Sequence, residues 1–253
     1  MIHRALKWVG AVLALAAVSA SRPPPATQPT TQPDNPFRKN VRVEITDDFL
    51  IVHSNGIPDH TTGPFPNARN PNRIRAQNYT FRIPRHPQPA DHVTRLPMGP
   101  IGVAINGVPF YNPYNREGQD AATNEVFDEC CGHPDERGRY HYHIYPKCIH
   151  TSFVDKPGEH SPLIGYAFDG YPIYGPNGDG GKPPTDLDEC NGHWDAVRGY
   201  HYHVTRKFPY ILGGYHGVVE TSNFDHPPGR GGRGPGRNGP PPPPDDGGPD
   251  GRP

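Results

Sequence analysis

Two identical Tyr-His-Tyr-His segments place four histidines in pairs whose spacing suits metal binding. His141 and His143 form one pair, and His201 and His203 form the other. Side chains at positions i and i+2 of a strand lie on the same face, about 6 to 7 Å apart, so each pair presents two imidazoles side by side. Imidazole is a suitable ligand for zinc, copper, iron and nickel. We therefore expect each pair to belong to a metal site, with copper or zinc as the ion.

A further histidine precedes each pair in a Gly-His turn. His133 and His193 would give each copy three nitrogen ligands, which fits an open catalytic or copper-type site better than a closed structural zinc site. An open coordination position would permit metal-assisted hydrolysis or redox chemistry. Most of the histidines outside this pattern are expected at the surface, with His216 as an outside candidate for the site. They are His53, His60, His86, His92, His150, His160, His216 and His226.

Acidic residues near the histidines are the candidates for proton transfer. Glu129 and Glu189 lie just before the Gly-His turns and are weak candidates for general bases. They and the preceding aspartates can also orient the imidazoles as hydrogen-bond acceptors. Asp169 is a third weak catalytic candidate, because it stands where the other copy has Asn106. The alternative is that the histidines are structural, each bonded to a carboxylate on a half-buried strand.

The histidine pairs belong to an internal repeat. Gly102–Tyr111 matches Gly165–Tyr174 at an offset of 63 residues, and Asp128–His133 matches Asp188–His193 at an offset of 60. Two copies are too few for a solenoid, so we expect two related motifs about a pseudo-two-fold axis, with the histidine sites either shared or separate. The copies span about residues 101–148 and 164–208.

Short apolar runs bounded by Gly, Pro, Asn and Asp predict a mainly β fold with short helices, in a single domain. The Asn-Gly and Asp-Gly pairs of the repeat indicate tight hairpin turns. Short helices are predicted at Ala121–Asp128 and Leu187–Cys190. The expected strands are Val41–Thr46, Phe49–Ser54, Gln77–Ile83, Gly102–Ile105, Tyr140–Tyr145, Ile164–Phe168 and Tyr200–Thr205.

The chain begins like an exported protein. Residues 1–20 contain basic residues, then an apolar stretch, then small residues, which is the layout of a cleaved secretory signal peptide. The apolar stretch is too short to span a bilayer, so we expect no stable membrane span after cleavage and a periplasmic, extracellular or cell-surface location. Pro-rich composition predicts a disordered linker at 21–36 and a disordered tail at 227–253, around one domain at 37–226.

The composition limits the classes of partner. The 25 Lys and Arg residues nearly balance the 26 Asp and Glu residues, so nothing in the charge favours nucleic acid as a partner. The histidine pairs make a metal ion the expected partner. The alternative is a non-catalytic binding or cell-surface module, in which aromatic residues line a groove for a sugar, a peptide or another small molecule. A metal-free hydrolase ranks last, because no Gly-x-Ser-x-Gly motif is present. The groove candidates are Tyr111, Tyr114, Tyr171, Tyr174 and Trp194.

Four cysteines in an exported chain predict disulfides. Cys130 and Cys190 are equivalent in the repeat, which favours a bond between them across the axis. Cys131 and Cys148 both belong to the first copy, and this is the preferred second pairing. Metal binding by thiolates is less favoured, because the adjacent Cys130 and Cys131 lack the Cys-x-x-Cys spacing of zinc sites.

These segments together resemble the YHYH family, exported proteins that are named for the Tyr-His-Tyr-His motif. The resemblance extends from about Val41 to His216 and is strongest in the two Tyr-His-Tyr-His strands, in Gly165–Tyr174 and in the two Asp-Glu-Cys segments. It implies an extracytoplasmic single domain and no settled activity. Asn191 stands where the first copy has Cys131, so a role of that cysteine is not shared by both copies.

Overall fold

The computed structural model describes residues 35–38, 40–149 and 158–224. The predicted signal peptide at 1–20, nearly all of the predicted linker at 21–36 and the predicted tail at 227–253 lie outside these residues, as do His150 and His226. No helix in the described ranges is long and apolar enough to cross a membrane.

The described chain is β-rich, as the sequence predicts, with one α-helix and two short 3-10 helices. The α-helix is α1 (Ala121–Asn124), and the 3-10 helices are η1 (Asp179–Gly181) and η2 (Thr221–Asn223). The strands are β1 (Arg42–Ile45), β2 (Phe49–Ser54), β3 (Tyr79–Pro84), β4 (Pro89–Thr94), β5 (Pro100–Ala104), β6 (Pro109–Tyr111), β7 (Gly132–Pro134), β8 (Tyr140–Tyr142), β9 (Leu163–Ala167), β10 (Pro172–Tyr174), β11 (Gly192–Asp195), β12 (Gly199–His203) and β13 (Tyr215–Gly217).

The two predicted helices differ in outcome. The helix expected over Ala121–Asp128 ends at Asn124, because Glu125 is extended. The helix expected over Leu187–Cys190 is wrong, because the carboxylate of Asp188 accepts hydrogen bonds from the backbone N–H groups of Cys190 and Gly192 and holds a turn there. An aspartate that bonds its own following backbone competes directly with a helix.

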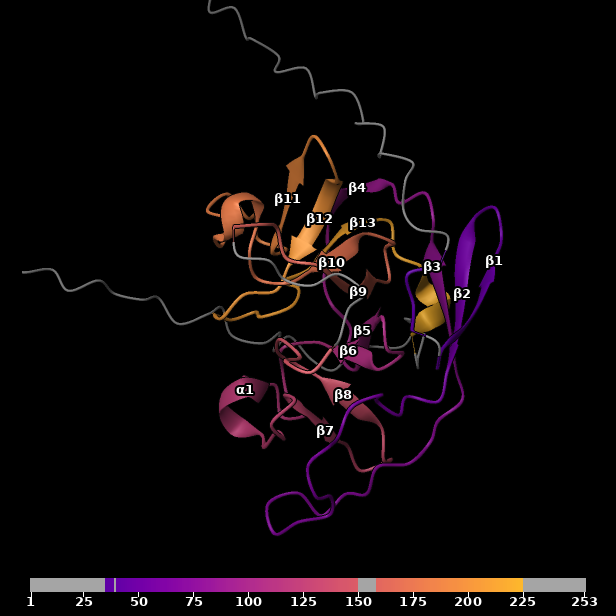
Figure 1. Cartoon of the computed structure of the whole chain (residues 1–253), viewed down its shortest axis with the longest axis vertical. Coiled ribbons are helices and arrows are strands. Elements are labelled where there is room, and N and C mark those ends of the chain that lie inside the picture. Colours follow the sequence, from indigo (N-terminus) through magenta and orange to yellow (C-terminus); the bar gives the residue numbers. More distant parts are fainter. Residues whose placement is uncertain (1–34, 39, 150–157, 225–253) are drawn as a thin grey trace, which may run out of the picture.

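An eight-stranded sheet carries both copies of the repeat. Its strand order is β11-β12-β10-β9-β5-β6-β8-β7, so the second copy occupies one half and the first copy the other. The central strands β5 and β9 are antiparallel, with Val103 opposite Tyr166. In Figure 1, β11 and β12 lie at one end of the long axis and β7 and β8 at the other. This palindromic order is what a pseudo-two-fold axis between β5 and β9 requires, and the axis itself stays a prediction.

A three-stranded sheet, β1-β2-β3, and a β13-β4 pair complete the fold. In β2, alternate residues are buried, and Val52 joins Phe81 and Ile83 of β3 in one core with the eight-stranded sheet. The rings of Phe81 and Phe168 are 5.4 Å apart and link the two sheets. The inner face of β2 therefore packs on the copy-bearing sheet as a hydrophobic support.

Each histidine hairpin begins with the same aspartate turn. In the first copy, Asp128 accepts hydrogen bonds from the N–H groups of Cys130 (2.9 Å) and Gly132 (3.1 Å) and from the hydroxyl of Tyr140 (2.8 Å). In the second copy, Asp188 accepts the corresponding bonds, including 2.8 Å from the hydroxyl of Tyr200. Position 132 requires glycine, because a Cβ there would lie 2.3 Å from the Tyr140 ring.

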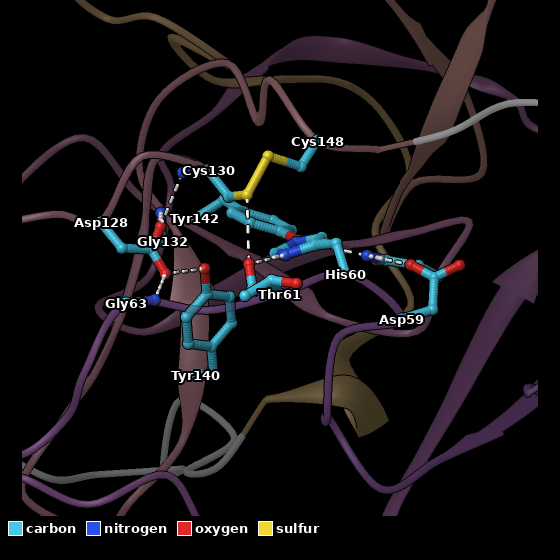
Figure 2. The surroundings of a disulfide bond; sticks show 11 residues. Asp59, His60, Thr61, Gly63, Asp128, Cys130, Gly132, Tyr140, Tyr142 and Cys148 are labelled. Atoms are coloured by element: carbon cyan, nitrogen blue, oxygen red, sulfur yellow. Dashed lines mark hydrogen bonds between the residues drawn. A yellow bond between two sulfur atoms is a disulfide. The ribbon is translucent and has the colours of Figure 1, made fainter.

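One disulfide joins Cys130 to Cys148, whose Cα atoms are 5.1 Å apart (Figure 2). The preferred Cys131–Cys148 pairing was therefore wrong: Cys131 follows Cys130 at a left-handed position (φ 66°), so the two adjacent side chains leave the turn in different directions. The predicted Cys130–Cys190 bond is also wrong, because these residues precede β7 and β11, the outermost strands at opposite ends of the sheet. Cys131 and Cys190 are buried and outside any disulfide.

The tyrosines of β8 and β12 face the core, away from the histidines. The hydroxyl of Tyr142 lies 2.7 Å from Nε2 of His60, which Figure 2 shows beside the disulfide. Its counterpart Tyr202 donates to the carboxylate of Asp169 at 2.5 Å. Asp169 is fully buried and also accepts from the N–H of Gly217 at 2.9 Å. Asp169 is thus a structural acceptor on the face opposite the histidines of its own copy.

We predict that Asp128→Ala lowers the free energy of unfolding by about 2 to 3 kcal/mol, because it leaves the buried Tyr140 hydroxyl and two turn N–H groups without their acceptor. Urea unfolding of the oxidised protein measures the change. Glu129→Ala, at the exposed neighbouring carboxylate, is the matched control and should change stability by less than about 0.5 kcal/mol. Equal stability of the two variants would contradict the role of the turn.

A second prediction concerns pH. Burial raises the pKa of Asp169 from 3.8 to about 6, against the opposing effect of its hydrogen-bond donors. The folded state therefore binds this proton more tightly than the unfolded state, and the associated stability, present at low pH, is lost as the pH rises through 6. Asp169→Asn keeps the shape and removes the charge. Relative to this variant, the wild type should lose about 2 to 3 kcal/mol between pH 4 and pH 7.

Urea unfolding with chelator present, at both pH values, tests this expectation. Asp48→Asn, at an exposed carboxylate, serves as the control. If the stability difference between wild type and Asp169→Asn were the same at pH 4 and pH 7, Asp169 would not be protonated on acidification in the folded state.

Candidate metal centres

Strand register brings three histidines together in each copy. β7 pairs with β8 so that His133 lies directly opposite His141, and β11 pairs with β12 so that His193 lies opposite His201. Directly opposite residues on antiparallel strands have their side chains on the same face, about 5 Å apart. The third histidine, two residues further along β8 or β12, shares that face.

Centre 1 consists of Glu125, His133, His141 and His143. The Nε2 atom of His141 lies 3.0 Å from Nε2 of His133 and 3.0 Å from Nε2 of His143. The carboxylate of Glu125, just past helix α1, reaches the same point: its Oε2 lies 3.0 Å from Nε2 of His133 and 3.4 Å from Nε2 of His143. These four donor atoms all lie within 4.8 Å of one another.

The Nδ1 atoms of centre 1 face away from this point, each toward a backbone carbonyl. His133 Nδ1 lies 3.1 Å from the carbonyl oxygen of Val126, His141 Nδ1 lies 2.8 Å from that of Arg139, and His143 Nδ1 lies 2.5 Å from that of Asn112. A carbonyl oxygen only accepts, so each Nδ1 carries a hydrogen, and a neutral ring then has its lone pair at Nε2. This is the outer-shell arrangement that metal-binding histidines ordinarily show.

Burial keeps the imidazoles of His141 and His143 neutral. It lowers the pKa of His141 well below its ordinary value and that of His143 to about 4, and neighbouring imidazoles add to both effects. Burial acts to raise the pKa of Glu125, but its contacts with the imidazoles of His133 and His143 outweigh burial and lower it. At neutral pH, His141 and His143 of centre 1 therefore present neutral nitrogen donors beside the carboxylate of Glu125.

Centre 2 consists of His160, His193, His201 and His203. The Nε2 atom of His201 lies 3.1 Å from Nε2 of His193 and 3.3 Å from Nε2 of His160. The donor atoms of His160, His201 and His203 all lie within 4.8 Å of one another. Among the described residues, Nε2 of His203 is one of the buried polar atoms that have no hydrogen-bond partner. An unpartnered buried nitrogen that faces other nitrogens fits a missing cation.

The outward nitrogens of centre 2 are held in the same way. Nδ1 of His201 lies 2.9 Å from the carbonyl oxygen of Gly199, Nδ1 of His203 lies 2.7 Å from that of Gly175, and Nδ1 of His160 lies 2.8 Å from that of Ser161. Nδ1 of His193 instead contacts the carboxylate of Asp186 at 2.9 Å. Burial lowers the pKa of His201 to about 4 and that of His203 to about 3.

These distances fit a transition metal. Tetrahedral ligands at about 2.0 to 2.1 Å from zinc are about 3.3 Å apart from one another. The donor atoms that lie next to each other in the two centres are 3.0 to 3.4 Å apart, which is close to that value, and the remaining donor pairs of centre 1 lie within 4.8 Å. A third group, His60 with Cys130 and Cys148, is less suitable, because its sulfur atoms form a disulfide and are not thiolates (Figure 2).

The two centres are separate. Centre 1 is on β7 and β8 and centre 2 is on β11 and β12, at opposite ends of the eight-stranded sheet (Figure 1). Five strand-to-strand steps from β8 to β12, at about 4.8 Å each, amount to about 24 Å along the sheet. A single ion therefore cannot bind to both histidine pairs.

Centre 1 opens into a cavity of about 730 Å³. The three histidines and Glu125 line it, together with residues of the loops before β3 and β5. Tyr111 stacks on His141, with ring centroids 3.9 Å apart, and the guanidinium of Arg139 lies 5.6 Å from the Tyr111 ring centroid. Small molecules can therefore reach an ion at centre 1 from one side.

The weak acidic candidates lie elsewhere. Glu129 and Glu189 are exposed in the turns before β7 and β11, and Glu129 lines a cavity of about 660 Å³ beside the disulfide. The aspartates that precede them bond to turn N–H groups and tyrosine hydroxyls, and the imidazoles are oriented by backbone carbonyls and Asp186 instead. The glutamate that does reach an imidazole cluster is Glu125.

The sequence interpretation did not include two members of the centres, Glu125 and His160. His160 was expected at the surface, yet its Nε2 faces His201. Both residues lie outside the matched segments of the repeat, so the self-similarity that revealed the other ligands could not find them. For Glu125, the signal was a carboxylate eight residues before His133, within the predicted helix Ala121–Asp128. His216, the outside candidate, stacks on Tyr200 at 3.7 Å on the core side.

The candidate groove aromatics do not share one surface. Tyr111 packs on centre 1, and Tyr174 packs edge-on against His201 of centre 2, with ring centroids 5.2 Å apart. Tyr171 is buried, whereas Trp194 is 53% exposed on β11. Tyr114 lines the cavity beside centre 1. Two of these five aromatic residues thus support the histidines, and the set does not form a single groove for a ligand.

Comparison with known proteins agrees with the family resemblance. The family described as YHYH protein matches residues 80–181, which include all of centre 1, His160 and the strands from β3 to β10. The second Tyr-His-Tyr-His strand lies beyond the matched residues. No curated protein and no solved structure matches the chain. The resemblance to the YHYH family is therefore confirmed over residues 80–181, where the family model matches this chain.

Proposed function

We propose that the protein is an exported metal-binding protein that holds copper or zinc at two separate histidine centres. The predicted ligands are the three histidines that the repeat places in each copy, and each centre has one further donor. In centre 1, the ligands are His133, His141, His143 and Glu125. In centre 2, they are His193, His201, His203 and His160.

The observation that carries this proposal is the convergence of nitrogen lone pairs. In centre 1, the Nε2 atom of His141 lies 3.0 Å from Nε2 of His133 and 3.0 Å from Nε2 of His143. The Nδ1 hydrogen of each of these rings is directed to a carbonyl oxygen. Lone pairs at this distance repel unless a cation lies between them. Protonation is opposed by burial, which depresses the pKa of His141 and His143. A metal ion satisfies all the nitrogens at once.

The donor chemistry restricts the ion. Calcium and magnesium prefer cages of oxygen ligands, whereas these centres offer mainly imidazole nitrogen. Copper and zinc bind imidazole well, and copper lies at the top of the affinity order for such sites. The histidines of both centres are buried or half-buried and supported by aromatic rings, so their positions are largely set before an ion arrives.

Export is supported by two features. The predicted signal peptide at 1–20 precedes the domain, and the Cys130–Cys148 disulfide is of the kind that persists in oxidising compartments such as the periplasm or the exterior. A location outside the cytoplasm would also expose the centres to the copper and zinc of the surroundings, where metal capture or delivery is needed.

We predict that the mature protein, purified from the exported fraction without chelator, retains two ions of copper or zinc per chain. His141→Ala/His143→Ala should retain one, His201→Ala/His203→Ala should retain one, and the fourfold variant none, because each centre loses two of its nitrogen donors. Elemental mass spectrometry measures the metal, and circular dichroism with an intact disulfide verifies folding.

His86→Ala/His92→Ala, at two histidines outside both centres, is the matched control and should retain both ions. If the folded wild type bound no metal, even after reconstitution with copper or zinc, the proposal would be rejected. A surface module with structural histidines would then be the better account.

A further inference from the structure

We infer that the two centres differ in metal preference, with centre 2 selecting copper and centre 1 accepting zinc. The inference rests on the proposed metal binding and concerns how each centre chooses its ion. The three repeat histidines are common to both centres, so the difference has to come from the fourth donor and from the charge around it.

Centre 1 has a carboxylate as its fourth donor. Oε2 of Glu125 lies 3.0 Å from Nε2 of His133 and 3.4 Å from Nε2 of His143, and Glu125 lines the cavity together with the three histidines. An ionised carboxylate cancels one charge of a bound dication. It also supplies an oxygen, which is a harder ligand than imidazole nitrogen.

Centre 2 has imidazoles as its donors: those of His160, His201 and His203 all lie within 4.8 Å of one another, and Nε2 of His193 lies 3.1 Å from Nε2 of His201. Nε2 of His160, 3.3 Å from Nε2 of His201, is the donor that the repeat does not supply. Two carboxylates lie near this centre, but both have other bonds. Asp186 contacts Nδ1 of His193, and Asp195 accepts from the guanidinium of Arg198 at 2.6 Å, leaving its oxygen 3.7 Å from Nε2 of His201.

The two donor sets differ in how strongly they favour copper over zinc. Copper(II) binds more tightly than zinc to nearly any nitrogen or oxygen site, but its advantage is greatest where the donors are nitrogen, and it falls when a carboxylate replaces an imidazole. With one equivalent of each ion, the exchange equilibrium therefore favours copper in centre 2 and zinc in centre 1, even though copper alone would bind to both.

The fourth donors are independent of the repeat, which makes them exchangeable. At the offset of 60 residues, Glu125 aligns with Thr185, and at the offset of 63, His160 aligns with Pro97. Neither the threonine nor the proline side chain is a usual ligand of copper or zinc. Each centre therefore has a shared core of three histidines and a donor of its own, and the two donors can be interchanged without altering the core.

The experiment compares single-centre proteins under competition. The His201→Ala/His203→Ala protein retains centre 1, and the His141→Ala/His143→Ala protein retains centre 2. Each mature full-length protein is stripped of metal, equilibrated with equal concentrations of Cu²⁺ and Zn²⁺ in a shared buffer ligand, desalted and analysed for both metals. We expect the bound copper-to-zinc ratio to be at least about tenfold higher at centre 2.

Exchange of the fourth donors is the decisive step. Glu125→His should raise the copper-to-zinc ratio of centre 1, and His160→Glu should lower that of centre 2. The number of nitrogen atoms coupled to copper in the EPR spectrum should increase in the first variant and decrease in the second. Glu129→His is the matched control, because it adds an imidazole beside the first copy but outside its centre.

The inference would be overturned, with metal binding intact, if the copper-to-zinc ratios of the two centres agreed within about twofold. It would also be overturned if these ratios stayed unchanged when the fourth donors were exchanged. Absence of both metals from both single-centre proteins would instead reject the proposed function. Should a donor exchange prevent folding, Glu125→Gln and His160→Gln provide the comparison: the loss of one donor should bring the two ratios closer together.

Discussion

The register of two short hairpins is the constraint on which the site depends. β7 and β8 pair so that one histidine lies directly across from another, and the same holds for β11 and β12. A slip of one residue would turn every histidine toward the core and every tyrosine toward the face that the histidines now occupy, because side chains alternate along a strand. The aspartate turn prevents this slip, since Asp128 and Asp188 tie the start of the hairpin to a tyrosine hydroxyl of the second strand.

The alternation of tyrosine and histidine follows from the same geometry. The tyrosines fill the core side of each strand and end in specific acceptors or donors, so the strand cannot rotate. On the opposite side, the outer carbonyls that orient the imidazoles come from the sheet itself: those of Asn112 and Gly175 lie just after β6 and β10, the parallel neighbours of β8 and β12. The sheet thus supplies both the ligands and the groups that direct them, a form of preorganisation that costs little when an ion binds.

The sequence predicted the parts of the site that follow local periodicity and the repeat. Six histidines, the β class and seven of the thirteen strands in the described residues were predicted, because alternation and self-similarity are visible in one dimension. Most strands of three residues, such as β6 and β7, were not predicted, since they are defined by their neighbours more than by their own sequence. The six-residue strand β4 was also missed, because its side chains are mostly exposed and show no alternation. Glu125 and His160 were missed because tertiary packing brings them to the clusters. The disulfide was misassigned between adjacent cysteines, where the choice depends on backbone direction at Cys131.

Comparison of the two copies separates what the fold needs from what the chemistry needs. Cys131 and Asn191 differ in type, yet both have a left-handed backbone, with φ of 66° and 65°, so this position is selected for a turn and not for a thiol. Asn106 and Asp169 differ in charge but both bond to the tyrosine hydroxyl behind a centre, so the requirement there is a polar partner. The three histidines do not differ at all. The turn residue, the buried partner and the fourth donor all change between the copies, whereas the three histidines stay constant. The constant residues are the ones that perform the task common to both copies. In these two centres that task is to bring three imidazoles together.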